Sequence, residues 1–187
     1  MMPDSAYSML EYAGVATGLL YLVLAIYQRR ECWGFYVISA IAYFPVMAHQ
    51  DLYLYAGMQF FFAASGIYGW YKWGREAAQP FQVGTIGTAV HFRWIVAGLL
   101  LSMGFADYLS LFGGFWNALA DALLSTFSLI ATLLTARKIL AGWHYWIAVN
   151  VLAVALYAYK AMWPTTLLYS IYLLSSIYGV RRWQRTK

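Results

Sequence analysis

The chain has 187 residues, of which 63% are apolar and 10% are charged. A soluble fold of this length does not carry seven long apolar runs, so the composition excludes a soluble protein and indicates one polytopic membrane domain over residues 1–187. The net charge of +5 does not indicate nucleic-acid binding, because the basic residues lie in short segments beside the apolar runs.

Seven apolar segments follow one another along the chain, and each is predicted to be a helix. Most of them approach the ~20 residues that cross a bilayer. In chain order they are Met9–Tyr27, Trp33–Ala48, Leu52–Tyr71, Trp94–Phe112, Phe115–Thr135, Ile139–Tyr159 and Pro164–Val180. Pro45 lies inside the second segment, where it removes a backbone donor and predicts a kink. The longest polar stretch, Gly74–Phe92, joins the third segment to the fourth.

The basic residues predict the orientation in the membrane. If all seven segments cross, only Lys160 of the 12 Lys and Arg residues lies on the side opposite the C-terminus. Positively charged residues accumulate in cytoplasmic loops. We therefore expect a multi-pass membrane protein with Met1 outside and the C-terminus in the cytoplasm.

The chain also repeats itself, without gaps, at an offset of 110 positions (residue 33 on residue 143). The aligned pairs include Trp33 with Trp143, Tyr36 with Trp146, Ile67-Tyr68-Gly69 with Ile177-Tyr178-Gly179, Trp73 with Trp183, and Glu11 with Asp121. One register across three helices exceeds what shared hydrophobicity would produce. It predicts two repeats, over residues 8–75 and 115–185, with a linker helix over residues 93–112.

Three crossings reverse the chain, so the extra fourth helix makes the two repeats parallel. A 3+1+3 membrane protein with parallel repeats has the architecture of the SWEET carriers, in which the substrate site lies between the repeats near the bilayer midplane. The predicted fold class is therefore an all-α membrane protein with seven transmembrane helices and a SWEET-like arrangement. The alternative from another class is a non-transporting membrane scaffold, which predicts a midplane filled by apolar side chains.

Polar residues at membrane depth are candidates for function because burying a polar side chain in the hydrocarbon costs free energy. Trp143, Trp146 and Asn150 are three and four residues apart, so they share one face of a helix. Two indoles and an amide suit a flat, polar or cationic ring, while an interfacial tryptophan belt is the alternative for Trp143. Gln59 either lines the substrate cavity or makes a hydrogen bond between helices.

Asp121 has two interpretations: a counter-charge to a cationic ligand, or a partner for a neighbouring helix near the outer interface. The same two interpretations apply to Glu11, its partner in the repeat. No catalytic constellation, phosphate loop or Cys/His metal cluster is present in the sequence, and Cys32 is the only cysteine. We expect no enzyme activity, no cofactor and no metal.

Three motifs resemble the Pnu family of bacterial vitamin transporters. They are Leu54-Tyr55-Ala56 to Gln59, Ile67-Tyr68-Gly69-Trp70-Tyr71-Lys72-Trp73, and Trp143-x-x-Trp146-x-x-x-Asn150. The resemblance covers nearly the whole chain. One departure is Gly66, where the family commonly has Asn, and it concerns the identity of the ligand rather than the fold.

The resemblance implies a SWEET-like fold, in many members a homotrimer, in a bacterial inner membrane. It also implies uptake of a vitamin by facilitated diffusion, followed by trapping through cytosolic phosphorylation. It assigns substrate binding to Gln59, Trp143, Trp146 and Asn150, and we add Asp121 and Tyr36, the repeat partner of Trp146. Nicotinamide riboside is the leading substrate, and thiamine or another vitamin is the alternative. A monosaccharide carrier follows only from the fold.

Overall fold

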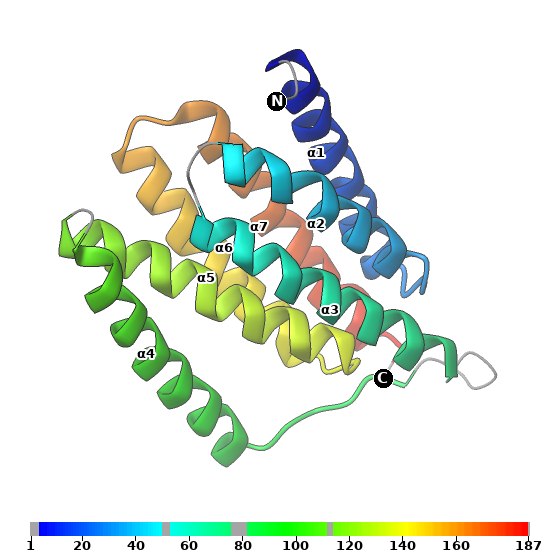
Figure 1. The fold of residues 1–187 in the computed structure, drawn as a ribbon. Helices are drawn as coiled ribbons and strands as arrows, with labels where there is room; N and C mark the ends of the chain where they lie inside the picture. Colours follow the sequence, from blue (N-terminus) through cyan, green and yellow to red (C-terminus); the bar gives the residue numbers. More distant parts are fainter. Residues whose placement is uncertain (1–3, 50–52, 76–81, 112–113, 187) are drawn as a thin grey trace. The chain divides into compact units, whose positions relative to one another are not determined.

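A computed structural model describes residues 4–49, 53–75, 82–111 and 114–186 of the chain. The described residues form seven α-helices: α1 (Asp4–Ile26), α2 (Cys32–His49), α3 (Tyr53–Arg75), α4 (Thr88–Ser110), α5 (Phe115–Ala136), α6 (Ala141–Tyr159) and α7 (Trp163–Gln184) (Figure 1). The chain divides into two compact units, Met1–Phe81 and Gln82–Lys187. The first unit holds α1 to α3, and the second holds α4 to α7.

In the first unit, α2 packs against both α1 and α3. Ser39 Oγ donates a hydrogen bond to the carbonyl oxygen of Gly14 on α1 over 2.9 Å. On the other side of α2, a Cβ added to Gly69 of α3 would overlap the indole of Trp33. Small residues thus let the helices approach closely, as is common between membrane helices.

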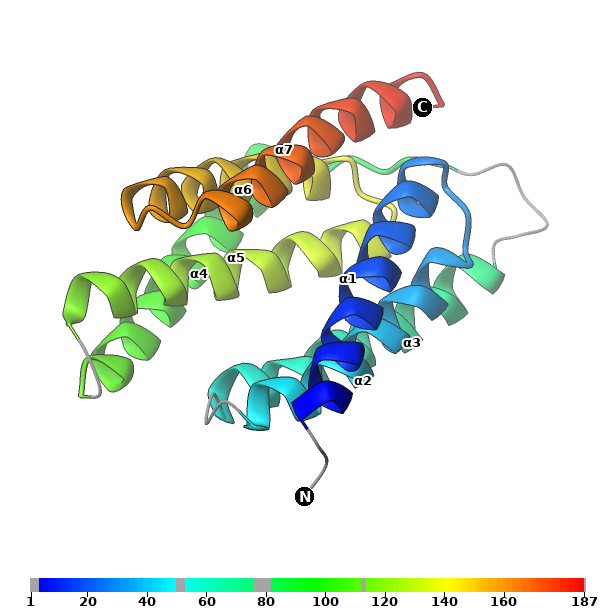
Figure 2. The same cartoon turned by 90° about the horizontal axis from the view of Figure 1, so that it is seen from above.

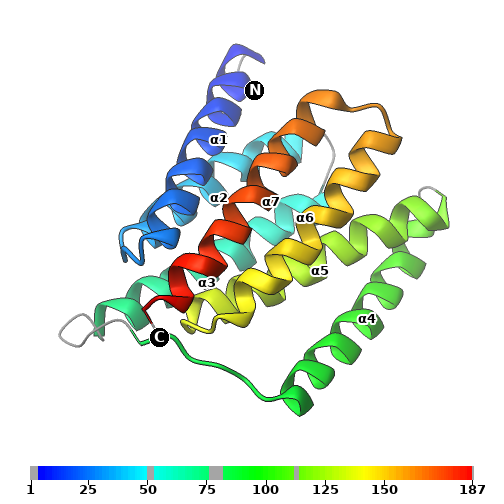
Figure 3. The same ribbon diagram turned by 180° about the vertical axis from the view of Figure 1, so that it is seen from behind.

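In the second unit, α5 packs against α4 and α6, and α6 packs against α7, so each helix lies beside its neighbour in the chain (Figures 2 and 3). Gly98 of α4 lies against Phe127 and Ile130 of α5. A buried cluster from α5 and α6 forms the core of this unit, and its members are Ile130, Ala131, Leu134, Ala141 and Tyr145.

The α1–α2 turn and the α5–α6 turn have the same backbone structure. Gln28 and Lys138, which are 110 positions apart, both adopt a left-handed conformation, with φ of 61° and 59°. The N–H of the next residue, Arg29 or Ile139, donates over 2.9 Å to the carbonyl oxygen five residues earlier. A residue with a Cβ adopts this conformation at a cost. Ala161 in the α6–α7 turn adopts it as well, with φ of 55°, and the N–H of Met162 donates to the carbonyl oxygen of Tyr157 over 2.9 Å.

Five helices of the described residues are long and apolar enough to cross a membrane: α1, α2, α4, α5 and α6. α3 and α7 are also long, with 23 and 22 residues, but they are more polar. α3 carries Gln59, Lys72 and Arg75, and α7 carries several hydroxyl side chains besides two arginines. The seven predicted helices are therefore present, and five of them have the composition of a membrane span.

The helix boundaries differ from the predicted ones at a few points. α4 begins at Thr88, earlier than the predicted linker helix, and packs on α5 as part of the second unit. α2 continues through Pro45 to His49. The predicted boundaries at Leu52 and Phe112, and the predicted external Met1, lie outside the described residues, as do residues 76–81 of the Gly74–Phe92 stretch.

The described end of that stretch is attached to the second unit. The N–H of Gly84 donates to the carbonyl oxygen of Lys138 over 2.9 Å, and the N–H of Leu140 donates to the carbonyl oxygen of Gly84 over 3.0 Å. This short parallel bridge fixes the chain entering α4 to the α5–α6 turn.

Candidate functional site

The predicted stripe of α6 faces α7 and forms a seam with it at three levels. Positions 143, 150 and 157 of α6 are seven apart and share a face, and α7 meets them with positions 179, 176 and 169 in the reverse order. Each level has its own chemistry: an indole on glycine, an amide on a hydroxyl, and a phenol on a phenol.

At the first level, Trp143 is only 2% exposed. A Cβ added to Gly179 would lie 2.6 Å from Trp143 Cε3, and the ring of Trp183 meets the Trp143 ring edge-on at 5.6 Å between centroids. The first unit contains the same arrangement, with Trp33 against Gly69 and edge-on to Trp73 at 5.5 Å. The structure thus places Trp143 in the packing of its unit.

At the second level, Asn150 is also 2% exposed and donates from Nδ2 to Ser176 Oγ over 3.1 Å. Ser176 Oγ in turn donates to the carbonyl oxygen of Tyr172 over 2.8 Å. Among the described residues, Asn150 Oδ1 has no hydrogen-bond partner, yet it is not one of the side-chain atoms sealed from the surface without a partner. The amide oxygen is therefore an unpaired acceptor that the described residues do not fully enclose, on an otherwise buried residue.

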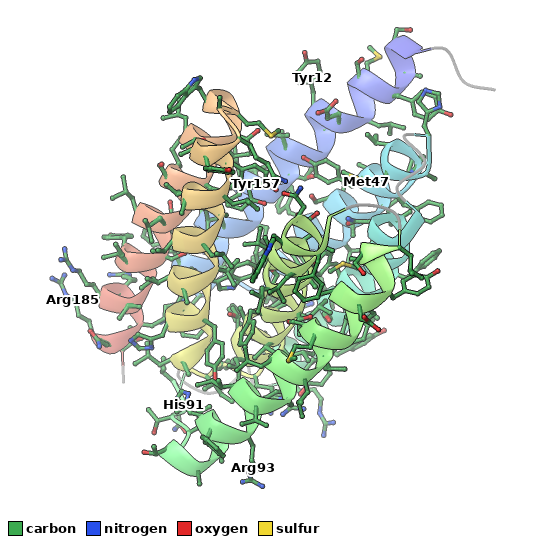
Figure 4. All side chains as sticks on the ribbon, turned by 90° about the vertical axis from the view of Figure 1, so that its left-hand side faces the viewer. Tyr12, Met47, His91, Arg93, Tyr157 and Arg185 are labelled. Carbon is green, nitrogen blue, oxygen red and sulfur yellow. The ribbon has the colours of Figure 1, made fainter. Side chains whose placement is uncertain are left out.

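At the third level, the rings of Tyr157 and Tyr169 stack at 5.2 Å, and Tyr172 meets Tyr169 edge-on at 5.7 Å. Asp121 of α5 lies in the neighbourhood of the Tyr157 hydroxyl. Figure 4 shows Tyr157 toward the end of the second unit opposite His91 and Arg93. The structure thus associates Asp121 with a group of phenols contributed by α6 and α7.

Trp146 lies beside the seam and is only half-buried. Its indole packs against the buried α5–α6 cluster that contains Ile130 and Tyr145. Of the two predicted indoles, Trp146 is the one with surface left for contact with a flat ring.

The other two predicted site residues, Gln59 and Tyr36, belong to the first unit. Gln59 of α3 is half-buried and makes no hydrogen bond to the described residues. Tyr36 of α2 packs on the ring of Tyr21 at 4.4 Å and meets Phe62 edge-on at 5.9 Å. Among the described residues, the Gln59 amide therefore has no partner, and Tyr36 is one member of an aromatic cluster.

Each unit carries its cations at one end, except for Lys160, which follows α6 at the other end of the second unit. In the second unit these lie at the start of α4, in the α5–α6 turn and at the end of α7, and Arg93 and Arg185 are labelled in Figure 4. In the first unit, Arg30 from the α1–α2 turn lies over the Trp70 ring of α3 at 4.4 Å. Among the described residues, no group of His, Cys, Asp and Glu side chains could hold a metal ion.

Sequence reasoning missed Ser176 and the phenols of Tyr157, Tyr169 and Tyr172. The repeat held a signal for Ser176, because it occupies the position of Gly66, directly before the Ile-Tyr-Gly motif. The partner of Asn150 in the repeat is Ala40, so the amide and the hydroxyl appear together only in the second copy.

Comparison with known proteins supports the membrane-transport interpretation. The model of the nicotinamide mononucleotide transporter family matches residues 8–185. The chain belongs to this family. The range includes both units and all of the predicted site residues.

Curated relatives in the family come from several bacteria. The nicotinamide riboside transporter PnuC of Escherichia coli is 24% identical to this chain, and the match covers 94% of this chain and 85% of that transporter's length. The PnuC of Shigella flexneri has the same values. The riboflavin/roseoflavin transporter RibM of Streptomyces davaonensis is 24% identical, and the match covers 92% of this chain and 83% of the length of RibM. These relatives are transporters and not enzymes, as the sequence predicted.

A solved structure shows the same fold. The crystal structure of the vitamin B3 transporter PnuC matches with a TM-score of 0.76 at 20% identity, over 96% of this chain and 82% of that one. The chain is thus a multi-pass membrane transporter of this family, as its motifs predicted.

Proposed function

We propose that the chain carries nicotinamide riboside across the inner membrane by facilitated diffusion. The observation that carries this proposal is the family match over residues 8–185, together with relatives that are named nicotinamide riboside transporters and cover most of the chain. Cytosolic phosphorylation would then retain the vitamin and keep its gradient directed inward.

The second unit offers groups that suit this substrate. The half-buried indole of Trp146 can stack on a cationic pyridinium ring, and the oxygen of Asn150 can accept a hydrogen bond. Asp121 contributes a carboxyl group in the neighbourhood of Tyr157. We assign Trp146, Asn150 and Asp121 to substrate binding in this unit, with Trp143 holding α6 against α7.

In the first unit we assign substrate binding to Gln59 and Tyr36. Gln59 lies in α3 and has no hydrogen bond to the described residues that would account for its amide. Tyr36 presents a phenol from a cluster of aromatic rings.

For the architecture, we propose seven crossings arranged as two parallel repeats and a linker helix, with the C-terminus in the cytoplasm. The repeated turns at Gln28 and Lys138 and the repeated Trp–Gly packing support a duplication. The gathering of cations at one end of each unit supports the orientation.

We further propose a homotrimer, as the resemblance to the Pnu family implies. Large apolar side chains, including Leu100, Leu101 and Met103 of α4, are exposed on the single chain and are available to lipid or to a second copy. Light scattering of the purified protein in detergent measures the number of chains in the particle.

The test of the function is transport by purified protein in liposomes. Uptake of labelled nicotinamide riboside should stop at equal concentrations on both sides and should reverse when the gradient is reversed. Accumulation above equilibrium that depends on a proton or sodium gradient would contradict facilitated diffusion. Asp121 would then be the first residue to test for coupling.

Riboflavin is a second candidate substrate, because RibM matches 92% of this chain. Both vitamins present a flat aromatic ring that an indole can stack on. Competition of unlabelled riboflavin and thiamine against labelled nicotinamide riboside in the same liposomes ranks the three vitamins.

A further inference from the structure

The hydrogen bonds at the middle level of the α6–α7 seam determine how the Asn150 amide is oriented. A serine hydroxyl has one hydrogen to donate and two lone pairs that accept. Ser176 donates its hydrogen to the carbonyl oxygen of Tyr172, four residues earlier on α7, over 2.8 Å. Towards Asn150, Ser176 can therefore only accept.

Only the nitrogen of the Asn150 amide can satisfy that acceptor. Nδ2 lies 3.1 Å from Ser176 Oγ and donates to it. The reverse orientation would set Oδ1 against the lone pairs of Ser176, with no hydrogen between the two oxygens. Because both residues are 2% exposed, water does not compensate such a mismatch, and the reverse orientation is disfavoured.

The remaining accessible group of the amide is its oxygen. Oδ1 has no partner among the described residues and is not sealed from the surface. Trp146 lies one helical turn away on the same face of α6, with surface left for a ring. A ring stacked on Trp146 would therefore lie about one helical turn from Asn150.

We propose that Ser176 is a positioning residue that makes Asn150 a hydrogen-bond acceptor, so that the site selects a carboxamide over a carboxylate on the ligand ring. This inference rests on the proposed function. A carboxamide has N–H groups to donate to Oδ1, whereas a carboxylate has only acceptors and would be repelled. The first unit has Ala40 and Gly66 at the matched positions, so this selection belongs to the second unit alone.

The test compares nicotinamide riboside with nicotinic acid riboside, which differ only in that group, by titration calorimetry on purified protein. The wild type should prefer the amide. In Ser176→Ala the amide of Asn150 is free to turn, so affinity for nicotinamide riboside should fall by about fivefold, the equivalent of one hydrogen bond. The preference for the amide over the acid should narrow by at least that factor. Ser176→Thr keeps the hydroxyl and should retain the preference.

Ser170→Ala is the matched control. Ser170 lies on the same helix and makes the same bond to the carbonyl oxygen four residues earlier, over 2.8 Å, but donates to no other helix. It should leave both affinities unchanged. If Ser176→Ala lowers the affinity for both ligands equally, or for neither, Ser176 has only a structural role and the inference is wrong. A wild type that binds neither ligand would contradict the proposed function and this inference together.

Discussion

The indole of Trp143 covers Gly179 so closely that an added Cβ would lie 2.6 Å from its Cε3 atom. Trp33 covers Gly69 in the same way, at matched positions of the other unit. The Trp–Gly contact therefore joins α6 to α7 and α2 to α3 at the end of each unit that carries the cations.

This contact predicts that alanine at either glycine destabilises the protein. Gly179→Ala overpacks the α6–α7 contact, and Gly69→Ala overpacks the α2–α3 contact. Each should lower the free energy of unfolding by about 1–3 kcal/mol. Gly57 and Gly104 have no atom within 4 Å of an added Cβ, so alanine there should be neutral or stabilising by about 0.5–1 kcal/mol. Thermal unfolding in detergent measures all four. Equal shifts in melting temperature at the packed and the open glycines would contradict the close Trp–Gly packing.

The two indoles of α6 should respond differently to removal. Trp146→Ala should weaken ligand binding by about tenfold, since ring stacking is worth roughly 1–3 kcal/mol, and should change stability less than Trp143→Ala. Trp143→Ala leaves a cavity and should lower stability by about 3–5 kcal/mol. Calorimetry and thermal unfolding of the same samples separate the effects. Trp163→Ala, at a side chain that is 66% exposed, is the control.

Gln59→Leu tests the two interpretations of the α3 amide. A cavity residue without a partner should leave thermal stability unchanged on substitution while nicotinamide riboside binds about tenfold more weakly. A loss of stability with unchanged binding would instead identify a hydrogen bond between helices.

The orientation is tested at the C-terminus. A reporter that fluoresces only in the cytosol, fused after residue 187, should be bright in intact cells. The control is the same reporter in the α6–α7 loop after Lys160, which should be dark. The reverse pattern in two inserted fusions would overturn the orientation.

The ion pair in the α1–α2 turn predicts a small pH dependence. The pKa of Glu31 is lowered by a backbone hydrogen bond and then by Arg29, whose Nε lies 3.3 Å from Glu31 Oε2. A carboxyl with a lowered folded pKa contributes stability above its unfolded pKa and loses it as the pH falls through the folded value. Both side chains are exposed, so Glu31→Gln should cost less than about 0.5 kcal/mol at pH 7. The difference in melting temperature should vanish in acid or high salt.

Some of the site follows from local spacing, and some does not. Positions 143, 146 and 150 share a helix face in any α-helix, so the stripe was predictable. The partner of that face was not, because Gly179, Ser176 and Tyr169 lie on another helix and their contacts depend on how α7 packs against α6. Spacing placed Trp143 and Trp146 on one face, whereas the structure buries Trp143 and leaves surface on Trp146.

The sequence by itself determined that the chain is a helical membrane protein of the Pnu type, because long apolar runs and the Ile-Tyr-Gly-Trp and Trp-x-x-Trp-x-x-x-Asn motifs depend only on the order of residues. Only the tertiary structure decided that Asn150 donates to Ser176 and exposes its oxygen. The physical reason is that a hydrogen bond between helices depends on distance and direction in space, and residues 26 positions apart meet only when α6 and α7 are packed.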